Sequence, residues 1–80
     1  MIYVFEVASP ALACGTPASD LDGEERTFQD TSLESATARA KRWLDSTFSY
    51  ASAERVAATS IRYVAEYPSL AAYRRAQEAA

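Results

Sequence analysis

The first eight residues, MIYVFEVA, are apolar at almost every position and end just before Ser9 and Pro10. β-Branched and aromatic residues favour a strand, and a proline stops one because it has no amide hydrogen to donate. Both faces of this segment are largely apolar, so the pattern predicts an interior strand that is covered on each face. Only the end that carries Glu6 is expected to reach water.

A second alternating segment lies at residues 24–30, after a stretch from residue 10 to residue 23 that is rich in proline, glycine, serine and aspartate. That stretch has no periodicity and predicts a loop, of a length often found at functional or mobile sites. Asp22 and Gly23 give a tight-turn signal at its end. Polar residues then alternate around Phe28, which predicts a short strand at an edge of the sheet.

The sequence TSLESATARAKRWL, residues 31–44, has the pattern of an amphipathic helix. Thr31 and Glu34 have the spacing of a capping box, in which each residue satisfies an amide of the first turn, so a helix is expected to start at Thr31. The apolar positions recur with a period near 3.6 residues and form one stripe. These positions are Leu33, Ala36, Ala40, Trp43, Leu44, Thr47 and Phe48.

Residues 50–67 fit both an alternating and a helical pattern, and we interpret 58–67 as a third strand because two strands alone make no stable sheet. Whether residues 50–60 form a loop or a helix is left open. After Pro68, a run of helix formers predicts a short C-terminal helix. The sequence therefore predicts one α+β domain over residues 1–80, a small antiparallel three-stranded sheet packed by one amphipathic helix, in the order β-β-α-β-α.

Charge divides the chain into two parts. Residues 1–34 hold seven acids and one base (−6) and residues 35–80 hold four acids and seven bases (+3), which together give the net charge of −3. Such a distribution predicts one acidic and one basic surface, which act on partner choice more than on fold. The expected partner-binding acids are Asp20, Asp22, Glu24, Glu25 and Asp30, and a second possible patch is Arg39, Lys41 and Arg42.

The residue inventory argues against catalysis. The chain has no histidine, one cysteine and two isolated glycines, so it lacks a nucleophile-base pair, a zinc set and a glycine-rich phosphate loop. We therefore expect no enzyme activity, no cofactor and no metal site. The acidic stretch before and after Gly23 does not match a calcium loop, since the glycine arrives too early. Cys14 is interpreted as a free thiol, with an interchain disulfide as the alternative.

Three functional classes remain. The first is a protein-binding module in the cytoplasm, where a lone cysteine stays reduced. The second is a homo-oligomer, for example a homodimer, that pairs through an exposed face of Ile2 and Val4. The third is a small RNA-binding module using Tyr63, Tyr67 and Tyr73, although a net acidic chain gains little from contacts with phosphates. No segment has the roughly 18 apolar residues that a membrane span needs.

The sequence FQDTSLESATARAKRWLDS follows a strand and carries Thr31 and Glu34 at the start of its helix. Over residues 24–48 it resembles the strand-to-helix unit of small phage and mobile-element proteins, several of which are anti-CRISPR inhibitors. The resemblance implies a non-enzymatic protein that blocks a larger nucleic-acid-handling complex by occupying its surface. In some such proteins, carboxylates take the place of nucleic-acid phosphates, which would match a basic groove on the partner.

Overall fold

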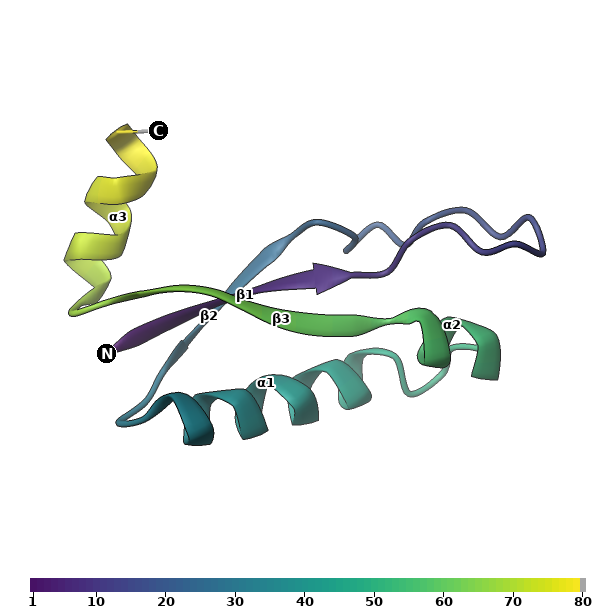
Figure 1. Cartoon of the computed structure of the whole chain (residues 1–80), viewed down its shortest axis with the longest axis horizontal. Helices are drawn as coiled ribbons and strands as arrows, with labels where there is room; N and C mark the ends of the chain where they lie inside the picture. Colours follow the sequence, from purple (N-terminus) through teal and green to yellow (C-terminus); the bar gives the residue numbers. More distant parts are fainter. Residues whose placement is uncertain (80) are drawn as a thin grey trace.

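The structure is a computed structural model that describes residues 1–79. A three-stranded antiparallel sheet in the order β2-β1-β3 has one long helix along one face, as Figure 1 shows. The predicted α+β class and the order β-β-α-β-α are confirmed, and the structure adds one short helix between α1 and β3. The elements are β1 (Ile2–Ala8), β2 (Glu25–Gln29), α1 (Leu33–Thr47), α2 (Ala53–Ala58), β3 (Ser60–Tyr67) and α3 (Leu70–Ala79).

β1 is the central strand, as its apolar residues on both faces predict. Tyr3 and Phe5 face α1 and are 4% and 1% exposed, while Ile2 and Val4 on the opposite face are 5% and 2% exposed. Glu6 is the half-buried polar residue of the strand, in agreement with the expectation that its end reaches water. Burial of both faces is what places this segment between two other strands.

The core between the sheet and α1 is built from small helix residues against large rings. Ala36 and Ala40 are fully buried and let the helix lie close to the sheet. The ring of Phe5 makes edge-to-face contacts with Phe28 at 5.8 Å and with Tyr63 at 6.1 Å between centroids. Aromatic side chains bury the largest areas, so these three rings compensate for a chain with few large aliphatic residues.

The start of α1 differs from the prediction by one residue. The predicted cap at Thr31 is wrong, since the helix begins at Leu33 and Ser32 is the N-cap, whose hydroxyl accepts the Ser35 amide at 3.1 Å. The reason is the preceding carboxylate: Asp30 accepts the Thr31 amide at 2.7 Å and the Ser35 hydroxyl at 2.8 Å. Asp30 therefore satisfies the turn before the helix, and the next hydroxyl caps the helix itself.

α2 resolves the ambiguous segment between α1 and β3. It begins after Ser52, whose side chain accepts the Arg55 amide at 3.2 Å as an N-cap. Because α2 occupies 53–58, β3 begins at Ser60, two residues later than the predicted start. The part of residues 50–60 that could have been loop or helix therefore contains a helix of six residues.

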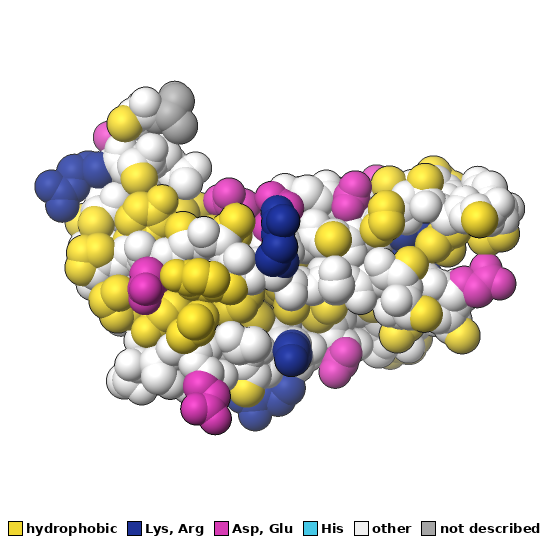
Figure 2. Space-filling model, viewed as in Figure 1, with side chains coloured by type: hydrophobic (Ala, Val, Ile, Leu, Met, Phe, Trp, Pro, Cys, Tyr) yellow, Lys and Arg dark blue, Asp and Glu magenta, His cyan; other side chains and the backbone are white. Residues whose placement is uncertain are grey.

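The two faces of the sheet are covered differently. α1 lies along one face, whereas α3 stands away from the other face near the N-terminus (Figure 1). The rings of Tyr67 and Tyr73 join α3 to the sheet at 5.5 Å, and Leu70 stays 43% exposed. Hydrophobic side chains gather around the base of α3 in Figure 2. The predicted exposed face of Ile2 and Val4 is wrong, because both side chains are buried on the central strand of the sheet.

Candidate functional site

The loop between β1 and β2 is an ordered extension of their hairpin, here called the arm (residues 9–24). The Val7 amide donates to the Glu24 carbonyl at 2.9 Å and the Gly23 amide donates to the Val7 carbonyl at 2.8 Å. Gly23 has φ +81°, so this position needs the conformational freedom of glycine, and it forms a bulge that twists the hairpin. Figure 1 shows the arm projecting beyond the sheet.

A buried arginine holds the arm against α2. Arg55 is 8% exposed, and its guanidinium donates to the carbonyl and hydroxyl oxygens of Ser9 at 3.1 and 2.9 Å. The same group donates to the carbonyls of Pro10, at 2.8 Å, and of Pro17. All these acceptors are neutral oxygens, and their hydrogen bonds replace those that the buried guanidinium would make to water. This makes α2 a support for the arm.

The hairpin register brings two acids face to face. Glu6 on β1 lies directly opposite Glu25 on β2, and on its other side Glu6 accepts from Arg62 of β3 at 2.8 Å. Figure 2 shows acidic and basic side chains side by side over the strands. We call the group at this end of the hairpin the acidic hairpin end. Its members are Glu6, Asp20, Asp22, Glu24 and Glu25.

The predicted acids near the arm differ in what they contact. Asp22 accepts the Ser9 amide at 2.8 Å, which fastens the arm to the end of β1. Glu24 forms an ion pair with Arg26 at 3.1 Å. In residues 1–79 the side chains of Asp20 and Glu25 are exposed and form neither a hydrogen bond nor an ion pair. These two carboxylates are therefore the ones most available to a partner.

Asp30 lies apart from the other predicted acids. It follows β2 at the end opposite to Glu25, roughly 17 Å away along an extended strand of five residues. Hydrogen bonds from the Thr31 amide and the Ser35 hydroxyl, together with the nearby Arg39 guanidinium, hold the pKa of Asp30 below its ordinary value of 3.8. Its contacts organise the entry to α1, so the structure gives it a local structural role.

The predicted basic patch is divided as well. Arg39 turns toward β2, where it donates to the Gln29 carbonyl at 2.5 Å, lies 3.6 Å from the Asp30 carboxylate and covers the Phe28 ring. Lys41 and Arg42 are exposed on α1. Arg39 therefore belongs to the packing of β2, which leaves two cations for any basic surface.

The tyrosine rings considered for RNA stacking do not form one surface. Tyr63 lies on the α1 side of the sheet against Phe5, whereas Tyr67 and Tyr73 contact each other at the base of α3. A stacking platform needs adjacent exposed rings along one groove. The geometry therefore does not favour an RNA-binding module.

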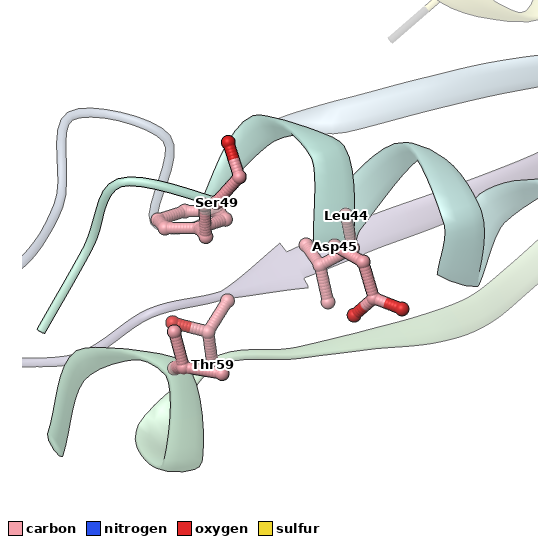
Figure 3. A pocket seen from close by; sticks show the side chains of 6 residues that line it. Leu44, Asp45, Ser49 and Thr59 are labelled. Carbon is pink, nitrogen blue, oxygen red and sulfur yellow. The ribbon is translucent and has the colours of Figure 1, made fainter. Parts of the chain in front are cut away.

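A shallow pocket of about 220 Å³ lies where the C-terminal end of α1 meets α2. Figure 3 shows Leu44 and Asp45 extending from α1, with Thr59 on the opposite wall. Its lining is mostly apolar and includes one carboxylate, that of Asp45. Across residues 1–79 no three potential metal ligands come together. The lining residues are Leu44, Asp45, Phe48, Ser49, Val56 and Thr59.

Sequence reasoning missed two residues that shape this region. Glu6 was assigned to a strand end and Arg55 was given no role, yet the first joins the acidic hairpin end and the second is buried under the arm. A tight turn at Asp22–Gly23 would pair Asp20 with Glu25, whereas the observed register, which closes across the whole arm, sets Glu6 opposite Glu25. Nothing in the local pattern around Arg55 signals its burial, because its acceptors lie about forty residues earlier in the chain.

Comparison with family models, curated proteins and solved structures gives no significant match for this chain. Among the helices in residues 1–79, none combines the length and apolar character needed to cross a membrane.

Proposed function

We propose that this chain is a non-enzymatic protein-binding module, an inhibitor of the phage type that blocks a nucleic-acid-handling complex. In this proposal the acidic hairpin end enters a basic groove of the partner in the cytoplasm. The support comes from where the unpaired carboxylates lie: Asp20 and Glu25 are exposed beside an arm held in one shape by Arg55. A preformed charged surface loses little conformational entropy on binding.

The observation that carries the proposal is the cross-strand pair of Glu6 and Glu25. Like charges directly opposite each other cost roughly 0.2–1 kcal/mol of stability in a sheet. Arg62 neutralises Glu6 alone, since its ion pair reaches that carboxylate at 2.8 Å. This ion pair offsets much of the repulsion within the pair and leaves Glu25 as the carboxylate without a counter-charge, which a cation supplied by a partner would neutralise.

Opposite charges accelerate association and select against partners of the same sign. A basic groove that normally holds nucleic acid is lined by arginine and lysine, which pair with carboxylates as they do with phosphates. The partner expected from this chemistry is therefore a protein whose basic groove is occupied either by nucleic acid or by this chain.

The test compares two variants with the same change in net charge. In the first, Asp20→Lys is combined with Glu25→Lys, which reverses the two unpaired acids near the arm. The control combines Asp45→Lys with Glu78→Lys, both exposed and each in or near the last turn of a helix, where a cation is tolerated. Tagged wild type and both variants are used to capture partners from a lysate of the native host, and circular dichroism checks their folding.

The proposal expects the wild type and the control to retain the same nucleic-acid-binding protein, and expects the first variant to lose it. Nucleic acid added in excess should displace the partner from the wild type. Equal capture by all three proteins, or a captured partner that nucleic acid does not displace, would rule out the acidic hairpin end as the binding surface.

A further inference from the structure

The two edge strands of the sheet, β2 and β3, differ in whether their outward-pointing backbone groups are protected. The amide and carbonyl of Val7 both point toward β2, so along β1 the odd-numbered residues face β2 and the even-numbered residues face β3. It follows that on β2 the outward-pointing groups belong to Glu25, Thr27 and Gln29. Unpaired groups of this kind invite another strand unless the edge is protected.

Two arginines protect the β2 edge. Arg26 donates to the outward carbonyl of Glu25 at 3.3 Å, and Arg39 donates to the outward carbonyl of Gln29 at 2.5 Å. The first guanidinium also lies over the Trp43 ring at 5.3 Å, which fixes its position. A strand that approached β2 would have to displace both cations, so this edge is protected at Glu25 and Gln29.

The β3 edge has no such protection. Its inward residues pair with the even-numbered residues of β1, so the outward groups before the β-bulge belong to Ile61 and Tyr63. In residues 1–79 no hydrogen bond reaches these outward groups. The adjacent side chains are accessible as well, with Tyr63 39% and Val64 41% exposed.

We propose that the β3 edge pairs with the β3 edge of a second copy of this chain, antiparallel about a two-fold axis at Arg62. Ile61 then exchanges two hydrogen bonds with Tyr63 of the second copy, and the symmetric pair adds two more. The two sheets of three strands become one continuous sheet of six. On the α1 side each pair sets a β-branched residue against an aromatic ring, a favourable cross-strand combination.

The bulge favours a second copy over an extended peptide from another protein. Because of the register shift between β1 and β3, the outward-pointing backbone groups of β3 belong to odd-numbered residues up to Tyr63 and to even-numbered residues after it. A long regular strand paired with β3 would therefore lose its hydrogen-bond partners at the bulge. A second copy needs only Ile61 and Tyr63. The two Arg62 side chains meet at the axis, and each is already neutralised by Glu6 at 2.8 Å.

The test is a disulfide placed at the axis. At a non-hydrogen-bonded antiparallel pair the Cα atoms lie about 4.5 Å apart, within the range that a disulfide spans. Arg62→Cys in a Cys14→Ser background should therefore form a covalent dimer quickly with oxidised glutathione. The matched control is Glu66→Cys in the same background, which exposes a thiol on β3 beyond the bulge and away from the axis.

Sedimentation velocity of the wild type over a wide concentration range gives the second readout, and a reversible monomer-dimer equilibrium is expected. Fast cross-linking of the Arg62→Cys variant together with slow cross-linking of the control supports the proposal. A wild type that stays monomeric, or a dimer in which both thiols react equally slowly, would overturn it. A dimer in which only the control cross-links would place the interface elsewhere and would also overturn it.

Discussion

Replacement of Arg55 by methionine tests how the arm is held. Methionine keeps a flexible stem of similar length and removes the guanidinium, so the oxygens of Ser9, Pro10 and Pro17 lose their donor. Pro10 and Pro17 are exposed, and their carbonyls can turn to water. Ser9 is fully buried, so its carbonyl and hydroxyl bear most of the cost, although each keeps one partner: the carbonyl accepts the Ser19 amide at 3.0 Å, and the hydroxyl lies 3.1 Å from the Thr59 hydroxyl.

The expected loss follows from those two buried oxygens. Each buried hydrogen bond lost by an oxygen that keeps another partner costs about 0.5–1.5 kcal/mol, which gives roughly 1–3 kcal/mol for the pair. Removal of a buried cation that has no carboxylate partner returns part of its desolvation penalty, so about 1–2 kcal/mol is expected. A chain of this size has about 5 kcal/mol of stability in total. The variant should therefore lose about a third of its stability.

Urea unfolding followed by tryptophan fluorescence measures the effect. With a slope of about 1 kcal/mol per molar urea, the midpoint should fall by roughly 1–2 M. Arg55→Lys keeps one charged donor group and should recover part of the loss, while Arg42→Met, on the exposed face of α1, serves as the control. A midpoint for Arg55→Met equal to that of the control would show that the Arg55 guanidinium does not stabilise the arm.

Three further changes test individual contacts. Ser32→Ala should cost about 1 kcal/mol in thermal unfolding and Thr31→Ala much less, because Ser32 caps α1; equal losses would contradict the cap assignment. Because the pKa of Asp30 is lowered on folding, its contribution is present above its ordinary pKa and is lost as the pH falls through the lowered value. Asp30→Asn should thus lower the free energy of unfolding at neutral pH and reduce its fall as the pH is lowered. A variant whose free energy of unfolding depends on acidic pH as steeply as that of the wild type would contradict this. Ala40→Leu should cost about 1–3 kcal/mol by overpacking a fully buried position, and a more stable variant would show unfilled space there.

The elements with strong periodic patterns could be predicted from the sequence. β1 has apolar residues on both faces, and such a strand is stable only in the centre of a sheet. Apolar positions recur regularly along α1 and β2, and they likewise predict the burial of the alanines at 36 and 40 and of the aromatic side chains on these two elements. The start of α1 was wrong by one residue because Asp30, Thr31 and Ser32 are all able to cap, and their relative positions decide which one does.

The candidate site was harder to predict because its geometry depends on long-range contacts. The five predicted acids form a nearly continuous series in sequence, yet β2 carries Asp30 to the far end of the sheet. Arg39 was counted as a free cation, although packing against Phe28 turns it toward β2. The burial of Arg55 depends on an arm from the opposite end of the chain, which no local window contains.

The decisive measurement for binding through the acidic hairpin end is its salt dependence. The dissociation constant of the captured partner is measured by biolayer interferometry at low and at physiological salt, for the wild type and for the variant reversed at Asp20 and Glu25. The account expects tight binding by the wild type that weakens steeply with salt, and much weaker binding by the variant at both salt concentrations. Wild-type and variant dissociation constants that agree at low salt would contradict it.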